Sequence, residues 1–165
     1  MFKINYKDIL LGSLITLTIF LVDRISKIYV LEIAEQGNVL DIYVTPYLNL
    51  YLIWNKGIAF GLFSFNTNYI YNLITLVIFV VIIIILVMII KANGLKKYLL
   101  LGILGGSLGN IFDRIYYSAV PDFIDLHING FHWFIFNIAD IFITLGIIGL
   151  IFDEIIYNIK NNEKN

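Results

Sequence analysis

A long, mostly apolar stretch over residues 69–90 constrains this chain more than any other feature, because it contains no charged side chain. A stretch of about 18 or more such residues is typical of a membrane span, since roughly 20 residues at about 1.5 Å each cross about 30 Å of hydrocarbon. The composition agrees, with 60% hydrophobic and 14% charged residues and a mean hydropathy of +0.89. Soluble domains carry about 25% charged residues. We therefore expect a compact polytopic membrane protein.

Three further apolar segments complete the predicted fold. They cover about residues 9–30, 98–116 and 137–157. The first could also be a removable signal peptide, but no small-x-small cleavage site follows it. We predict an all-α membrane protein of four transmembrane helices, forming a single domain over residues 1–165.

The basic residues predict the orientation of these spans. Lysine and arginine are enriched in short cytoplasmic loops. Seven of the eleven fall at the N-terminus, in the loop between the second and third spans, or at the C-terminus: Lys3, Lys7, Lys91, Lys96, Lys97, Lys160 and Lys164. Both termini are therefore predicted to be cytoplasmic.

The acidic residues gather at the opposite side. Eight of the twelve fall at outer span ends or in the two outer segments, about residues 31–68 and 117–136: Asp23, Glu32, Glu35, Asp41, Asp113, Asp122, Asp125 and Asp140. Acidic residues contribute little to orientation, so this asymmetry indicates a site on the outer face.

The two outer segments differ in pattern. Residues 38–65 alternate in places between apolar and polar side chains, which predicts short strands that form a small extracytoplasmic β-cradle at the membrane surface. Residues 118–136 are interrupted by Pro121 and Gly130, and we expect a short outer loop or helix there, anchored at the interface by His132-Trp133-Phe134.

Several chemistries are disfavoured. The net charge of −1 gives no basic field for nucleic acid, and the absence of cysteine excludes disulfides and thiolate sites. His127 and His132 fit no zinc-protease spacing, and Ser26 and Lys27 diverge around a helix, which disfavours a Ser/Lys dyad. The sequence has no phosphate-binding glycine loop. We expect neither a metal nor a cofactor.

Carboxylates near hydrocarbon are costly and are therefore candidate functional groups. Asp23 and Lys27, spaced i and i+4, are best explained as a salt-bridged structural clamp. Three helically spaced glycines precede a second group at the membrane edge, which places an amide, a carboxylate and a guanidinium on one helix face: Asn110, Asp113 and Arg114.

Two more carboxylates suit a specific reaction. Asp122 follows Pro121 among apolar residues, and Asp140 lies one turn inside the last span, after a possible capping Asn137. Two facing carboxylates share a proton, so one can activate water while the other protonates a leaving amide. This is the chemistry of an aspartyl peptidase.

Taken together, the motifs resemble those of the bacterial lipoprotein signal peptidases, the type II prolipoprotein peptidases. The resemblance covers nearly the whole chain and rests on five motifs in order: Asp23 with Lys27, Asn55-Lys56-Gly57-Ile58-Ala59-Phe60-Gly61, Gly105-Gly106 through Gly109-Asn110 with Asp113-Arg114, Val120-Pro121-Asp122-Phe123, and Phe136-Asn137-Ile138-Ala139-Asp140.

This resemblance implies a globomycin-sensitive aspartyl endopeptidase of the bacterial inner membrane. It would cleave prolipoproteins before a diacylglyceryl-modified cysteine, as a monomer in contact with membrane lipid and without a cofactor. Asp122 and Asp140 would be catalytic. The implied substrate-binding or supporting residues are Asp23, Lys27, Asn55, Gly57, Asn110, Asp113, Arg114 and Asn137.

Three positions depart from the family pattern: Arg24, Trp54 and Ile58. They bear on substrate fit more than on the acidic pair, for which Asp125 is a competitor of Asp122. An ion-coupled transporter using the same carboxylates is an alternative, although the apolar second span offers no relay across the membrane. A non-catalytic assembly factor would leave the acidic pair unexplained.

Overall fold

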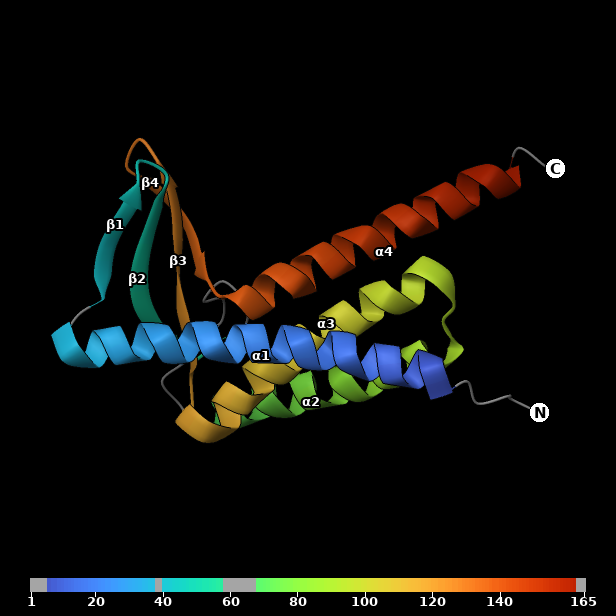
Figure 1. Ribbon diagram of the computed structural model, residues 1–165, viewed down its shortest axis with the longest axis horizontal. Coiled ribbons are helices and arrows are strands. Elements are labelled where there is room, and N and C mark those ends of the chain that lie inside the picture. Colours follow the sequence, from blue (N-terminus) through green and yellow to red (C-terminus); the bar gives the residue numbers. More distant parts are fainter. Residues whose placement is uncertain (1–5, 38–39, 58–67, 163–165) are drawn as a thin grey trace.

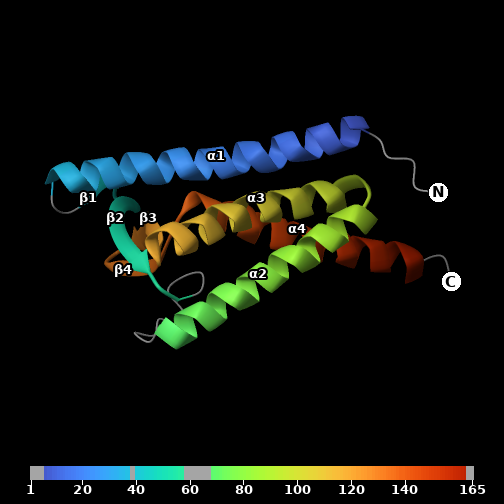
Figure 2. The ribbon, with the colours of Figure 1, turned by 90° about the horizontal axis from the view of Figure 1, so that it is seen from below.

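The computed structural model describes residues 6–37, 40–57 and 68–162. Four long helices form the body of the molecule: α1 (Tyr6–Gly37), α2 (Asn68–Lys91), α3 (Gly94–Tyr117) and α4 (Ile138–Asn162). Figure 1 shows the start of α1 and the end of α4 at one end of the molecule and a small sheet at the other. In Figure 2, α3 lies between α1 and α2. All four predicted segments are helical, and α1 departs most from its expected range of 9–30 because it continues to Gly37.

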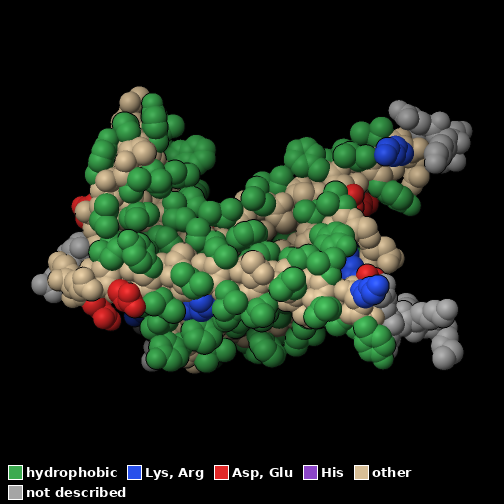
Figure 3. Space-filling model, viewed as in Figure 1, with side chains coloured by type: hydrophobic (Ala, Val, Ile, Leu, Met, Phe, Trp, Pro, Cys, Tyr) green, Lys and Arg blue, Asp and Glu red, His purple; other side chains and the backbone are tan. Residues whose placement is uncertain are grey.

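The helices expose a large apolar surface, whose contact with water would be energetically unfavourable. Large side chains such as Ile25, Ile90 and Ile151 are more than half exposed, and hydrophobic atoms cover most of the face in Figure 3. Two helices have the length and composition of membrane spans, Tyr6–Gly37 and Tyr69–Lys91. The protein is mostly helical, and two of its helices are long and apolar enough to cross a membrane.

Glycines allow α3 to pack closely against its neighbours. A Cβ on Gly106 would lie 2.5 Å from the Ala139 carbonyl oxygen of α4, and one on Gly105 would lie 2.9 Å from the Thr16 carbonyl oxygen of α1. These contacts bring α3 against the helices that carry the other polar groups of the predicted site. The packing role predicted for the glycine motif is confirmed.

A four-stranded antiparallel sheet covers the other end of the bundle. Its strands lie in the order β1 (Asp41–Thr45), β2 (Leu48–Asn55), β3 (Val120–Ile128) and β4 (Phe131–Phe136). Register pairs such as Asn55 with Val120 join the two outer segments. The strands predicted in the first outer segment are thus confirmed.

The expectation of a short loop or helix in the second outer segment is wrong. Residues 120–136 form a hairpin that turns at Asn129 and Gly130, both with positive φ (51° and 79°). Asn-Gly is the preferred sequence for a two-residue hairpin turn, because both positions need a left-handed backbone. Gly130 therefore forms the turn that joins β3 to β4 and does not mark an irregular loop.

Candidate active site

Asp122 lies on β3 and is completely buried. Two amides fix its carboxylate. Asn137 donates a hydrogen bond of 2.6 Å to Oδ1, and Asn55, at the end of β2, donates one of 2.9 Å to Oδ2. The sheet and the start of α4 therefore hold this side chain from two directions.

Asp140 sits in the first turn of α4 and is 4% exposed. Its backbone N–H donates to Asn137 Oδ1 at 3.1 Å, and its Oδ2 accepts from the Asn137 N–H at 3.2 Å. This reciprocal pair is a capping box, which satisfies two otherwise unpaired helix-end donors. The predicted capping role of Asn137 is confirmed. Through its amide, the same residue joins Asp140 to Asp122.

The environment of Asp122 favours its protonated form. Burial and, to a lesser degree, the neighbouring Asp140 carboxylate together raise its pKa to about 7, against the lowering effect of the hydrogen bonds from Asn55 and Asn137. Near neutral pH this carboxyl group is therefore divided between its acidic and ionised forms. Such a group can exchange a proton during a reaction.

A buried ionic cluster is connected to Asp140 through Asn110. Lys27, on α1, contacts Asp23 Oδ2 at 2.9 Å and Asp113 Oδ2 at 2.7 Å, and Arg24 Nη1 contacts Asp113 Oδ1 at 2.6 Å. Lys27, Asp23 and Asp113 have no exposed surface, so each charge depends on its partner inside the protein. The predicted clamp between Asp23 and Lys27 is confirmed, and it extends onto α3.

This ionic cluster is connected to the carboxylate pair. Asn110 accepts a hydrogen bond of 2.9 Å from Lys27 and donates one of 2.9 Å to Asp140 Oδ1. Asp23 Oδ1 accepts from the backbone N–H of Ala139 at 3.0 Å, which ties α1 to the start of α4. Helices α1, α3 and α4 are thus connected through polar side chains at one level.

Arg114 lies in the last turn of α3. Its Nη2 donates to the Gly57 carbonyl oxygen, and its guanidinium lies 5.5 Å from the centre of the Tyr71 ring. The Gly57 N–H donates in turn to Asn55 Oδ1 at 2.7 Å. Arg114 Nε and Nη1 are buried without a hydrogen-bond partner among the described residues. These two groups can donate to a bound molecule.

The structure separates Asp125 from Asp122. The two residues are three positions apart on β3, and side chains on a strand alternate between its faces. Asp125 pairs with His132 Nδ1 at 2.8 Å, whereas Asp122 shares Asn137 with Asp140. This geometry favours Asp122 over its competitor.

Sequence reasoning missed two contributors. Tyr71, on α2, supports Arg114 through its ring and donates a 2.8 Å hydrogen bond to the Arg114 carbonyl oxygen. Arg24, seen in the sequence only as a departure, is part of the ionic cluster. Its position one residue after Asp23 gave no sign of contact with α3.

The other two departures from the family pattern are Trp54 and Ile58. Trp54 packs against Tyr117, at 5.5 Å between ring centres, and Ile58 lies outside the described residues.

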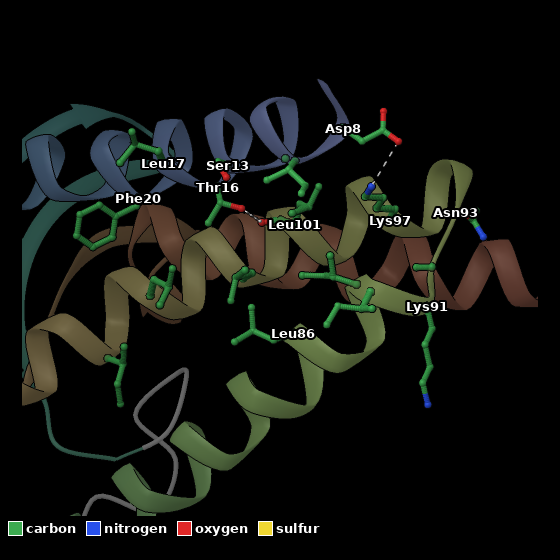
Figure 4. A pocket seen from close by; sticks show the side chains of 18 of the residues that line it. Asp8, Ser13, Thr16, Leu17, Phe20, Leu86, Lys91, Asn93, Lys97 and Leu101 are labelled. Carbon is green, nitrogen blue, oxygen red and sulfur yellow. Dashed lines mark hydrogen bonds and ion pairs between the residues drawn. The ribbon is translucent and has the colours of Figure 1, made fainter. Parts of the chain in front are cut away.

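A large apolar cavity of about 1140 Å³ lies between α1, α2 and α3. Figure 4 shows Leu17, Phe20 and Leu86 along it and Lys97, paired with Asp8, at one end. None of the predicted site residues lines this cavity. It is distinct from the carboxylate pair.

Comparisons with known proteins show the family of this chain. The sequence profile of the family described as signal peptidase (SPase) II matches residues 15–156. This chain belongs to the signal peptidase II family. Similar proteins include the lipoprotein signal peptidase of Pelagibacter ubique (strain HTCC1062), at 54% identity over 99% of both chains. That of Anaplasma phagocytophilum (strain HZ) is 42% identical over 84% of this chain and 88% of its own.

A solved structure shares this fold. A bacterial membrane enzyme determined at 2.3 Å by the in meso method superimposes with a TM-score of 0.69, at 29% identity over 87% of each chain. The chain is therefore an enzyme, a peptidase of the family that removes signal peptides from lipoproteins. The predicted resemblance is confirmed, and the transporter and assembly-factor alternatives are set aside.

Proposed function

We propose that this protein is an aspartyl endopeptidase in which Asp122 and Asp140 form the catalytic pair. The supporting observation is the position of Asn137, whose side chain donates to Asp122 and accepts from the Asp140 backbone. The two carboxyl groups interact strongly enough for Asp140 to raise the pKa of Asp122. Close carboxyl groups that share one proton supply both an acid and a base.

The reaction follows from this shared proton. The ionised carboxylate accepts a proton from water as the water oxygen bonds to the scissile carbonyl carbon. The neutral carboxyl group donates its proton to the leaving amide nitrogen as the carbon–nitrogen bond breaks. The products are a carboxyl terminus and a free amine, and the pair again holds one proton. No step requires a metal ion or a covalent intermediate.

The surrounding groups hold the substrate backbone. Arg114 Nε and Nη1 are buried donors that a peptide carbonyl can satisfy, and Gly57 fixes the third guanidinium nitrogen. Asn110 positions Asp140. The ionic cluster of Asp23, Lys27 and Asp113 acts at a distance, because it fixes Asn110 and the start of α4.

The substrate is a prolipoprotein whose cysteine carries a diacylglyceryl group, and cleavage occurs just before that cysteine. Aromatic side chains exposed on the sheet suit the membrane interface, where a lipidated residue would lie: Tyr43, Tyr47, Tyr51 and Trp133. The sheet acts as the predicted cradle. Globomycin inhibits this same site.

All four helices span the bacterial inner membrane in this proposal. Helices α3 and α4 contain 24 and 25 residues, which at about 1.5 Å each exceed 30 Å. The start of α1 and the end of α4 lie at the end opposite the sheet (Figure 1), so both termini are cytoplasmic when the sheet faces outward. The enzyme acts as a monomer in contact with membrane lipid.

Cleavage by the purified protein tests this function. A precursor fragment with a diacylglyceryl-modified cysteine should be cut to a product that begins at that cysteine, as read by mass spectrometry. The matched fragment with an unmodified cysteine should remain intact, and globomycin should block cleavage of the modified one. Equal cleavage of both fragments, or a new terminus elsewhere, would contradict the assigned substrate.

A further inference from the structure

The β3–β4 hairpin carries a second group of ionisable side chains that the peptidase site does not use. Asp125, His127 and His132 each offer one ligand atom, and these three atoms lie within 4.8 Å of one another. His127 and His132 are direct register partners across the hairpin, and their rings stack at 5.1 Å between centres. The spacing of these residues in the sequence does not match a metal-binding motif, because the pairing of β3 with β4 is what brings them together.

Both histidines present the same nitrogen to the carboxylate. His132 Nδ1 lies 2.8 Å from Asp125 Oδ2, and His127 Nδ1 lies 3.7 Å from the same oxygen. In a tetrahedral zinc site with bonds of about 2.0–2.1 Å, neighbouring ligand atoms are about 3.3–3.4 Å apart. The two nitrogen–oxygen separations lie on either side of that value, and the two imidazole ligand atoms lie within 4.8 Å of each other. Small shifts of the histidine side chains would bring all three atoms to ligand distances.

The polar atoms of this group are incompletely satisfied. Asp125 is 3% exposed, and His127 Nδ1 is buried without a hydrogen-bond partner among the described residues. Asn49, the register partner of Asp125 on β2, also has a buried side-chain oxygen without such a partner. Buried polar atoms normally have a hydrogen-bond partner, so His127 Nδ1, whose nearest charged contact is Asp125 at 3.7 Å, has the capacity to bind an ion shared with that carboxylate.

One side of the site is held by a backbone hydrogen bond, and the other side is open to solvent. The His127 backbone N–H donates to the Tyr47 carbonyl oxygen at 3.0 Å, which holds β3 against the β1–β2 turn. The His132 side chain is 56% exposed, compared with 13% for His127. An ion can therefore enter from the solvent side and keep a position for water.

We propose that Asp125, His127 and His132 form a binding site for a zinc-class divalent cation on the outer hairpin. Two imidazole nitrogens and one carboxylate, with an open fourth position, are a donor set that Zn²⁺ accepts. The ion replaces the proton between His132 and Asp125 and cross-links β3 to β4. This site lies apart from the residues assigned to peptide cleavage, and its existence does not depend on that assignment.

Direct metal binding tests the proposal. The full-length protein, without a histidine tag, is purified in detergent, treated with a chelator and titrated with Zn²⁺ alone by calorimetry. The metal content after dialysis is measured by mass spectrometry. We expect one zinc ion per chain, a higher unfolding temperature with zinc, and a visible absorption band of tetrahedral Co²⁺ when cobalt replaces zinc.

Variants locate the ion. The chain contains only two histidines, so His127→Ala and His132→Ala test every imidazole ligand. Each should weaken zinc binding at least about tenfold, and the double variant should lose the cobalt band. His132 is exposed, so its replacement leaves the buried packing intact. Asp41→Asn, which changes an exposed acidic residue on β1, is the matched control and should bind zinc normally.

Two results would overturn the proposal. One is the absence of saturable zinc binding by the unmodified chain. The other is unchanged zinc binding by the double histidine variant, which would assign the metal to surface carboxylates. Circular dichroism of each variant confirms that the helices remain folded in the samples compared.

Discussion

Asn137 donates a 2.6 Å hydrogen bond to the buried carboxylate of Asp122. Its side-chain oxygen accepts from the backbone of Asp140 as the N-cap of α4. One amide therefore fixes the geometry between β3 and α4, which are separated in the chain by β4. The two roles of Asn137 can be separated by substitution.

Asn137→Ala and Asn137→Ser should both lower kcat/KM by roughly 10- to 100-fold, because each removes a buried hydrogen bond to a carboxylate, worth about 1.5–3 kcal/mol. Serine can still cap the helix. The alanine variant should therefore be less stable than the serine variant by about 1 kcal/mol in unfolding free energy. Denaturation in detergent and peptide cleavage measure the two effects. Wild-type kcat/KM in the serine variant would show that the bond to Asp122 is not needed.

The raised pKa of Asp122 predicts a dependence of stability on pH. The folded protein holds this proton up to about pH 7, whereas the unfolded chain releases it near 3.8. The contribution of Asp122 to stability is therefore fully present below about pH 3.8 and is lost as the pH rises to about 7.

Asp122→Asn removes this titration. The unfolding free energy of the variant, relative to that of the wild type, should increase steadily between pH 4 and pH 7 and then level off. Chemical denaturation at a series of pH values measures the difference. A constant difference across this range would mean that Asp122 is ionised throughout.

Lys27 should be essential for stability because it neutralises two buried carboxylates. Lys27→Met should lower the unfolding free energy by about 3–5 kcal/mol, the usual cost of removing one partner from a buried ion pair. Adding Asp113→Asn should restore part of this loss. Lys97→Met is the matched control, because Lys97 forms only a loose surface contact of 4.0 Å with Asp8 and should cost less than about 1 kcal/mol. Equal losses in the two lysine variants would argue against the ionic cluster.

The glycines of α3 test the close packing of this helix against α4. Gly106→Ala places a methyl group 2.5 Å from a backbone oxygen of α4 and should destabilise the protein by about 1–3 kcal/mol. Gly102 offers a control on the same helix, since its nearest contact would be an ordinary 3.9 Å. Gly102→Ala should be neutral or stabilising by up to about 1 kcal/mol. Thermal unfolding in detergent distinguishes these outcomes, and equal behaviour of both variants would contradict the close approach of α3 and α4.

Much of this arrangement could be predicted from the sequence, because it depends on local patterns. The length of the apolar segments indicated the four helices, and the alternation of apolar and polar residues indicated β1 and β2. The i, i+4 spacing of Asp23 and Lys27 indicated their ion pair. The Asn129-Gly130 turn carried a usable signal for the missed hairpin, since this dipeptide favours two positive φ angles.

Other features depend on contacts between distant segments and have no local signal. The contact of Arg24 with Asp113 requires α1 to pack on α3, and the support of Arg114 by Tyr71 requires α2 to lie beside it. The grouping of His127, His132 and Asp125 depends on the register of β3 and β4. Sequence spacing alone does not specify these pairings.

Cleavage kinetics of Asp122→Asn and Asp140→Asn test the central claim most directly. Asp153→Asn, which makes the same change farther along α4, is the matched control. Cleavage of a diacylglyceryl-modified precursor should fall by about 10²- to 10⁴-fold in each of the first two variants, because each loses one acid–base group. The control should cleave at the wild-type rate. Near-wild-type cleavage by either Asp122→Asn or Asp140→Asn, in protein that is folded and inserted, would contradict the catalytic pair.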